Sequence, residues 1–148
     1  MPKRPIRLAA RALIMFNNRL LMVNAWPDGK SDLWCAPGGG AEPHHSLPDN
    51  LAREVHEETG LTVAVGAPCL VNEFHAPEQG FHQVDVYFRC DVTAGELSES
   101  WRDPEGIVTK RRFFSRSELS DVRHKPDSLA DVAWGDGFAY DALEPLVR

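Results

Sequence analysis

The first thirty residues alternate between apolar runs and polar turns. Residues 8–16 form an apolar run with β-branched and aromatic members, residues 17–19 are polar, and residues 20–23 are apolar again. This pattern predicts a β-hairpin, because two apolar runs are joined by a short turn of residues that favour turns. Residues 24–30 then carry several turn residues and predict a loop.

The pattern between residues 46 and 60 predicts an amphipathic helix. Three apolar residues recur at every fourth position and form one stripe: Leu47, Leu51 and Val55. Ser46 is expected to cap the first turn, with Asp49 as its partner in a capping box. Gly60 is expected to end the helix in a left-handed conformation.

The remaining apolar runs predict further strands and one short helix. A strand at residues 33–36 is expected to run into a tight loop at residues 37–40, where three successive glycines permit conformations that other residues resist. Residues 93–106 are polar and rich in turn residues, whereas the tail, residues 127–148, has no assignable pattern. The other predicted elements are strands at 61–65, 67–74, 84–90 and 107–114, a loop at 75–80, and a helix at 115–119. This order predicts a single domain of α/β (α+β) class over residues 1–148.

Composition excludes some partners and compartments. The chain has 148 residues with 16 Lys and Arg against 22 Asp and Glu, so its formal net charge is -6. This acidic balance argues against a protein that binds nucleic acid or anionic membranes. Three cysteines without a C-x-x-C spacing indicate neither a disulfide framework nor a zinc knuckle. Arg11 interrupts the apolar stretch after the basic start, and residues 12–16 are too short for a signal peptide or a membrane span, so we expect a cytoplasmic protein.

One face of the predicted helix is strongly acidic. Glu54, Glu57 and Glu58 stand at i, i+3 and i+4, where each like-charge pair costs roughly 0.2 to 0.5 kcal/mol. Between residues 42 and 58 the chain has five acidic residues against one basic residue, Arg53, which gives a local charge of -4. A solvated helix face is the simple interpretation. The alternative is a site for Mg²⁺ or Mn²⁺, because carboxylates and the carbonyls of a glycine loop are the oxygen ligands that hard cations bind.

The residues around this helix resemble the Nudix box, whose pattern is G-x5-E-x7-R-E-U-x-E-E-x-G-U, with U a bulky aliphatic residue. Eight of its nine fixed positions match: Gly39, Arg53, Glu54, Val55, Glu57, Glu58, Gly60 and Leu61. The departure is His45, which stands where the pattern has its first glutamate. In the family that glutamate lies near the metal cluster and can pair with the arginine corresponding to Arg53, so His45 removes one negative charge. A transition-metal site at His44 and His45 is a further interpretation, although two adjacent side chains rarely face one ion.

The resemblance, which extends over roughly residues 8–119, implies a single Nudix-like domain with a mixed β-sheet sandwiched between helices. It implies a pyrophosphohydrolase that cleaves the diphosphate linkage of a nucleoside diphosphate derivative, with Mg²⁺ or Mn²⁺ as cofactor. The implied metal ligands are Glu54, Glu57, Glu58 and the backbone carbonyl of Gly39. For Glu54 the alternative to a ligand is the base that activates water. Arg53 is implied to orient Glu54 or its neighbours, and an ordinary i,i+4 ion pair with Glu57 is the alternative.

Two further aspects of the resemblance concern residues outside the box. Some Nudix enzymes take a base or metal ligand from a loop, for which Asp103 and Glu105 are the best-placed candidates; plain loop charge is the alternative. Pro77 lies sixteen residues after the box, a position associated in the family with ADP-ribose. ADP-ribose or another sugar nucleotide is therefore favoured, and a nucleoside triphosphate comes second. Four aromatic residues are available to stack on a base or to pack in the core: Trp26, Trp34, Phe74 and Phe81.

Two other functions are weighed against hydrolysis. The first is a catalytically weak Nudix-fold module that binds a nucleotide for regulation, which the change at His45 favours. The second is a structural protein that binds a divalent cation and has no relation to nucleotides. Since many Nudix proteins are dimers, a homodimer is a further expectation, and the expected partner is a small molecule linked to a nucleoside diphosphate.

Overall fold

The computed structural model describes residues 4–27 and 29–148, so Lys3 of the basic start and Asp28 of the predicted loop lie outside the described residues. The strands are β1 (Arg7–Phe16), β2 (Arg19–Asn24), β3 (Trp34–Cys35), β4 (Gly38–Gly40), β5 (Thr62–Ala76), β6 (Phe81–Ala94), β7 (Arg111–Phe114), β8 (Ala139–Tyr140) and β9 (Glu144–Pro145). The helices are α1 (Leu47–Thr59), α2 (Arg116–Ser120), α3 (Leu129–Ala133) and the short 3-10 helix η1 (Pro77–Gln79).

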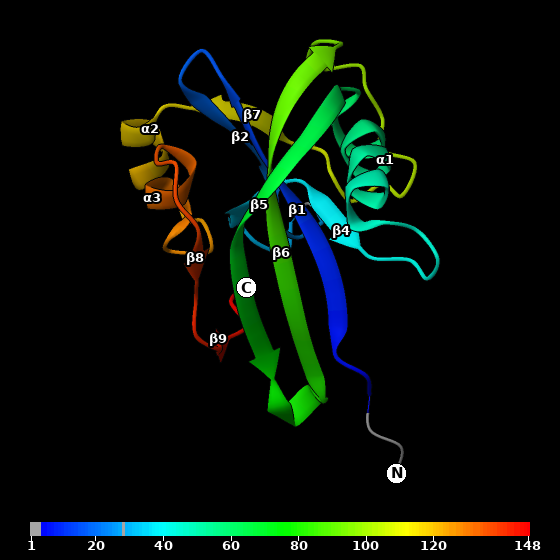
Figure 1. Ribbon diagram of the computed structural model, residues 1–148, viewed down its shortest axis with the longest axis vertical. Helices are drawn as coiled ribbons and strands as arrows, with labels where there is room; N and C mark the ends of the chain where they lie inside the picture. Colours follow the sequence, from blue (N-terminus) through cyan, green and yellow to red (C-terminus); the bar gives the residue numbers. More distant parts are fainter. Residues whose placement is uncertain (1–3, 28) are drawn as a thin grey trace.

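Within the described residues, these strands form one mixed sheet with helices on both faces. The order along the sheet is β3-β2-β1-β6-β5-β8, and β4, β7 and β9 pair with β1, β2 and β5. Strand β1 runs parallel to β6 and antiparallel to β2 and β4. Helix α1 lies on one side of the sheet, and α2 and α3 lie on the other (Figure 1). The predicted fold class, a mixed sheet between helices, is confirmed.

The core is divided by the sheet into two clusters of buried side chains. One cluster packs Leu51 and Val55 of α1 against alternate residues of β1, such as Ala12 and Ile14. The other packs side chains of α2 and α3 against the opposite face, which includes Leu13 of β1. Neighbouring residues of β1 thus point to opposite faces, as the period of a strand requires, and both faces are buried.

The predicted hairpin and the predicted helix are both confirmed. Met15 pairs with Leu20 across the hairpin, and the two turn residues, Asn17 and Asn18, have φ values of 51° and 59°. Positive φ at both positions is typical of the two-residue turn whose twist matches that of the strands. In α1, Ser46 Oγ accepts a hydrogen bond from the backbone N–H of Asp49 (3.1 Å), and Gly60 has a φ of 78°.

The capping box is found at another helix. At α1 the structure has only the bond to Ser46, because an aspartate side chain is one methylene shorter than the glutamate of that motif. At α2, by contrast, Ser115 and Glu118 exchange both bonds. The prediction of a capping box with Asp49 was therefore wrong, whereas the helix predicted at residues 115–119 is confirmed within one residue.

The tight loop predicted at residues 37–40 is wrong, because Gly38–Gly40 forms strand β4 and pairs with Ala9–Arg11 of β1. Gly38 has a φ of 152°, and a Cβ atom there would overlap the carbonyl oxygen of Ala10. The glycines therefore serve a close approach of two strands rather than a turn.

Several other boundaries differ from the prediction. Strand β6 begins three residues before the strand predicted at 84–90 and ends four residues after it. The strands predicted at 61–65 and 67–74 form one strand, β5, whose pairing with β6 shifts between Val65 and Leu70. The strand predicted at 107–114 is confined to β7, because Asp103 and Asn24 hold the segment before it through backbone N–H groups. The unassigned tail forms α3, β8 and β9. None of the helices in the described part of the chain is both long and apolar enough to cross a membrane.

Candidate functional site

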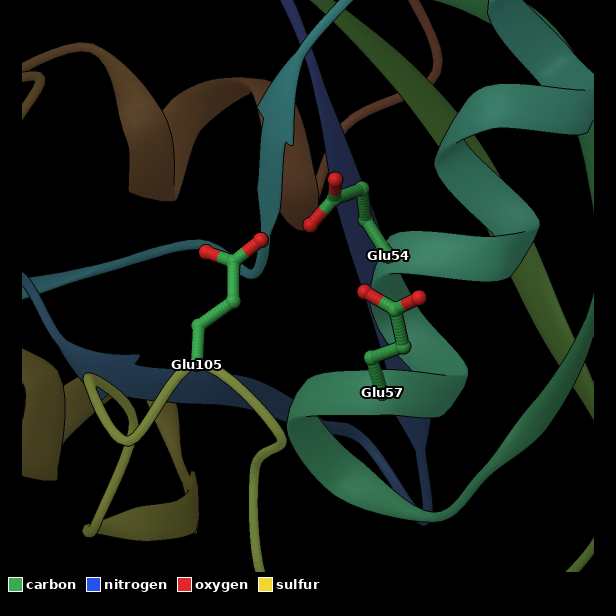
Figure 2. A group of neighbouring side chains, drawn as sticks. All are labelled: Glu54, Glu57 and Glu105. Carbon is green, nitrogen blue, oxygen red and sulfur yellow. The ribbon is translucent and has the colours of Figure 1, made fainter.

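Three carboxylates from two elements converge at the acidic face of α1. Glu54 and Glu57 project from α1 toward Glu105, which lies on the loop between β6 and β7 (Figure 2). Each of these residues offers an oxygen, and the three oxygens lie within 4.8 Å of one another. Burial raises the pKa of Glu54, and the carboxylates of Glu105 and Glu57 raise it further, whereas Arg53 lowers it. Such a cluster suits a divalent cation, because the ion cancels the repulsion that the carboxylates otherwise bear.

Arg53 contacts three carboxylates around this cluster. Its guanidinium lies 3.1 Å from Glu57, 3.4 Å from Glu54 and 3.3 Å from Glu42. Both interpretations of Arg53 given above therefore describe contacts that exist, the i,i+4 pair with Glu57 and the contact with Glu54. Sequence reasoning missed Glu42, which approaches Arg53 from the segment between β4 and α1. Arg53 thus has an ion-pair partner in Glu42, although His45 replaces the glutamate that the Nudix box has at its position.

Asn50, a buried residue of α1, ties this segment to the helix. Its side-chain oxygen accepts hydrogen bonds from the backbone N–H of Glu42 and from Arg53, both at 3.2 Å. Its amide nitrogen donates to the carbonyl of Gly40 (3.0 Å). Asn50 thereby fixes β4 against the acidic face of α1. Gly39 completes this approach, because a Cβ atom there would lie 2.8 Å from the carboxyl group of Glu54.

Glu58 lies apart from the three clustered carboxylates. Its side chain is buried and accepts a hydrogen bond from the backbone N–H of Gly38 (3.3 Å). Burial raises the pKa of Glu58 to about 8, an effect that Arg11 and the Gly38 hydrogen bond oppose. Glu58 lines the same cavity as Glu54 and the three glycines of β4. Its assignment as a metal ligand stays a prediction.

The choice between Asp103 and Glu105 is explained by the hydrogen bonds of their loop. The Asp103 carboxylate accepts from the backbone N–H groups of Glu105, Ile107 and Val108 at 2.9 to 3.2 Å. These bonds shape the loop and leave the Glu105 carboxylate directed at the cluster. Trp101 holds the same loop to α1 by donating from Nε1 to the carbonyl of Glu57 (2.8 Å).

Asn24, at the end of β2, is a further anchor that sequence reasoning missed. Its side-chain oxygen accepts from the backbone N–H groups of Thr109 and Lys110 at 2.9 and 3.0 Å. Its amide donates to the carbonyls of Trp26 and Ile107, both at 2.8 Å. One buried amide therefore joins the loop that carries Glu105 to the loop that carries Trp26. Its position beside a strand end gave no periodic signal in the sequence.

We expect Asn24→Ala to destabilise the fold by about 2 kcal/mol, because it leaves buried backbone groups without partners. For a domain of this size, the thermal midpoint should fall by roughly 4 to 8 °C. Calorimetry would measure this shift, with Gln79→Ala, the loss of an exposed amide, as the control. An unchanged midpoint for Asn24→Ala would contradict the anchoring role.

Two adjoining cavities lie beside the cluster and share Arg7, Arg11, Ala25 and Cys35 in their walls. The first, of about 370 Å³, is the acidic cavity; its wall includes Glu42, Glu54, Glu58, Asp103, Glu105 and the glycines of β4. The second, of about 310 Å³, is the aromatic cavity; its wall includes Trp26, Phe74, Phe81, Lys125 and the C-terminal residues 144–147. Together they form one cleft with a carboxylate end and an aromatic end.

Three of the four aromatic candidates therefore meet in one cavity, and the fourth does not. Trp34 packs edge-on against Phe114 at a centroid distance of 5.0 Å, beside the core cluster. Pro77 begins η1, at the turn between β5 and β6, and belongs to neither cavity wall. The residues of the turn region that reach the aromatic cavity are instead Phe74 and Phe81, whose rings lie 6.0 Å apart.

Comparison with known proteins agrees with this architecture. The chain is 35% identical over 97 residues to diphosphoinositol polyphosphate phosphohydrolase 2 of Rattus norvegicus, covering 64% of this chain and 51% of that protein. It is 27% identical over 92 residues to the ADP-ribose pyrophosphatase of Methanocaldococcus jannaschii, covering 61% and 53%. The chain thus spans about half the length of these curated relatives.

The fold is also found among solved structures. The crystal structure of a UDP-X diphosphatase superposes with a TM-score of 0.72 at 21% sequence identity, covering 97% of this chain and 70% of that one. The NUDIX domain family model matches residues 5–134, which is most of the sequence. Because this match includes the acidic helix, the β4 glycines and the Glu105 loop, the chain belongs to the NUDIX domain family.

Proposed function

We propose that this protein is a metal-dependent pyrophosphohydrolase that cleaves the diphosphate linkage of a nucleoside diphosphate derivative. The observation that carries the proposal is the convergence of Glu54, Glu57 and Glu105 beside a cleft, where Glu54 and Glu105 line one end and aromatic rings line the other. A diphosphate is polyanionic, so it is repelled by this cluster unless cations neutralise the carboxylates. Mg²⁺ and Mn²⁺ are the proposed cofactors, since the three converging ligand atoms are all carboxylate oxygens.

The residues that would hold the metal are Glu54, Glu57 and Glu105, with Glu58 and the carbonyl of Gly39 in the same cavity wall. When bound, a divalent cation polarises a phosphoryl oxygen and generates a nucleophile from water. The alternative role of Glu54 is the base that would accept a proton from water, since Arg53 holds its carboxylate beside the cluster. Arg53 orients Glu54 and Glu57 through the two ion pairs it makes with them.

The aromatic cavity supports a nucleotide as the group attached to the diphosphate. Trp26, Phe74 and Phe81 offer ring faces on which a base can stack. ADP-ribose or another sugar nucleotide is the favoured substrate, in line with the named activity of the M. jannaschii relative, and a nucleoside triphosphate comes second. A substrate with many phosphates is less suited, because it needs many cations. Among the described residues, the cleft walls include only three cationic side chains, those of Arg7, Arg11 and Lys125.

The test is phosphate release, coupled to a phosphatase, from ADP-ribose, sugar nucleotides, dinucleoside polyphosphates and nucleoside triphosphates, with Mg²⁺ or Mn²⁺. We expect cleavage of ADP-ribose or a sugar nucleotide that disappears on addition of EDTA. Cleavage that persists in EDTA would contradict the metal requirement. If the protein binds nucleotides but cleaves none of them, the alternative of a regulatory binding module is correct instead.

Glu42 and His45 distinguish these two functions. Since Glu42 already supplies a carboxylate to Arg53, we expect His45→Glu to change turnover by less than about twofold. Glu42→Gln should lower turnover by up to about fivefold, which corresponds to the loss of an exposed ion pair of about 1 kcal/mol. Steady-state kinetics at saturating Mg²⁺ would measure both. A large rise in turnover for His45→Glu would favour the binding module.

The remaining proposals concern location and partners. A cytoplasmic location is proposed on the apolar stretch that Arg11 interrupts, and a homodimer on the family resemblance. A partner set limited to small nucleotide-linked molecules is proposed on the charge balance and that resemblance. The single domain over residues 1–148 is proposed on the order of its elements, and residues 5–134 of it match the family. Sedimentation velocity of the purified chain would measure its oligomeric state.

A further inference from the structure

Arg7, the first residue of β1, lies where the acidic and aromatic cavities meet. It belongs to the walls of both cavities. Its guanidinium packs against Gly40 of β4, where an added Cβ atom would lie 2.7 Å from Nη2 of Arg7. Its Nη1 donates a hydrogen bond to the side-chain oxygen of Gln83. Gln83 is buried, and its own amide nitrogen donates to Asp85 (2.7 Å). The group that accepts the hydrogen bond from Arg7 is therefore held in place.

The charge of Arg7 distinguishes it from the other two cations of the cleft walls. Arg11 pairs with Asp85 at 3.4 Å, and Lys125 pairs with Asp127 and Glu144 at 3.1 and 3.5 Å. Among the described residues, Arg7 has no carboxylate within ion-pair distance, and its contact with Gln83 is to a neutral amide. A guanidinium has five N–H donors in a planar fork, so Arg7 keeps donors and a full charge for an anion in the cleft.

We propose that Arg7 binds the substrate phosphate that is attached to the group in the aromatic cavity. This inference rests on the proposed function, because it assumes that the substrate extends from the carboxylate cluster to the aromatic rings. A guanidinium binds phosphate through parallel charge-assisted hydrogen bonds, which fix orientation as well as supplying affinity. Arg7 therefore positions the diphosphate linkage of the substrate. One phosphate binds its guanidinium, and the next phosphate lies toward Glu54, Glu57 and Glu105.

The glycine opposite Arg7 is part of the same arrangement. Because Gly40 has no side chain, the guanidinium occupies the space that a Cβ atom at Gly40 would need. Gly40→Ala would move the Arg7 guanidinium without removing its charge. This substitution therefore separates the position of the cation from its presence.

The test compares the binding of ADP, used as its non-hydrolysable α,β-methylene analogue, with that of adenosine by isothermal titration calorimetry at saturating Mg²⁺, so that the carboxylate cluster is neutralised and hydrolysis does not occur. Arg7→Gln should weaken ADP binding at least about tenfold, the usual loss for a hydrogen bond between charged groups, and leave adenosine binding within about twofold. Arg7→Lys should restore part of the ADP affinity, and Gly40→Ala should weaken ADP binding with the charge retained. The matched control is Arg4→Gln, which removes an exposed arginine of the same segment.

Three results would overturn the inference. The first is unchanged ADP binding in Arg7→Gln. The second is an equal loss of affinity for ADP and adenosine in that variant, which would mean that Arg7 only shapes the aromatic cavity. The third is a wild-type protein that binds no ADP at millimolar concentration. The proposed function fails separately: if the protein binds ADP through Arg7 but cleaves no substrate with Mg²⁺ or Mn²⁺, the phosphate site stands and the hydrolase does not.

Discussion

Replacing Glu57 by glutamine is expected to lower metal-dependent phosphate release at least about 100-fold. Groups that only support a metal ligand typically change activity or metal affinity 10- to 100-fold, so the loss of a ligand should reach at least the upper end of that range. Glutamine keeps the size of the side chain and removes its charge. Stopped assays of the best substrate at saturating Mg²⁺, together with calorimetric titration of the metal-free protein with Mn²⁺, would measure both consequences.

The stability of this variant should hardly change, which separates a lost ligand from a lost fold. Glu57→Gln removes an exposed i,i+4 ion pair with Arg53 but also a repulsion with Glu54, and each of these is worth less than about 1 kcal/mol. Glu96→Gln, the same change at an exposed residue of the loop after β6, is the matched control. If Glu57→Gln retains both turnover and Mn²⁺ affinity within about threefold, the carboxylate cluster is not the metal site.

The part of the site that the sequence predicted is the part encoded by local spacing. Glu54 and Glu57 lie on one face of α1 because residues three apart are neighbours on any helix, and Arg53 reaches Glu57 by the same geometry. Ser46 and Gly60 delimit the helix through interactions within a few residues. Such relations hold before any tertiary structure is known.

The part that the sequence left open depends on contacts between distant segments. Asp103 and Glu105 were indistinguishable as two acids of one loop. In the structure Glu105 joins the carboxylates of α1, whereas Asp103 accepts backbone bonds within the loop. Asn24 contacts residues more than eighty positions away. Asn50 lies in the predicted helix, but its partners lie on β4 and the segment after it. A single buried amide leaves no periodic pattern by which these roles could have been predicted.

The glycines of β4 were predicted to form a tight loop that brings backbone carbonyls close to the carboxylates of α1, and the loop in this prediction is wrong. Their backbone freedom was assigned to a turn, because three successive glycines usually break an element. All three instead make room for another group: Gly38 for the backbone of β1, Gly39 for the carboxyl group of Glu54, and Gly40 for the guanidinium of Arg7. Glycine is used both where two segments approach closely and where the chain turns sharply. The sequence alone does not distinguish these two uses.

Gly38→Ala should therefore destabilise the fold by at least about 3 kcal/mol. A φ of 152° is a conformation that L residues rarely adopt, and the new Cβ atom would meet the backbone of Ala10 and Arg11, which cannot rotate away. Relief requires β4 to separate from β1, which adds a cost like that of overpacking a core. Since Gly38 also donates to Glu58, the same movement would disturb the acidic cavity. Urea unfolding followed by circular dichroism would measure the loss.

The control for this prediction is Gly137→Ala, because a Cβ atom there meets nothing within 4 Å. That change should be neutral or stabilise the protein by up to about 1 kcal/mol, since alanine restricts the unfolded chain more than glycine does. The two substitutions are chemically identical, so opposite signs would show that the approach of β4 to β1, rather than glycine content, determines stability. A Gly38→Ala protein as stable as the Gly137→Ala protein would contradict the close contact of these strands and its role in holding Glu58 and Gly39 beside the carboxylate cluster.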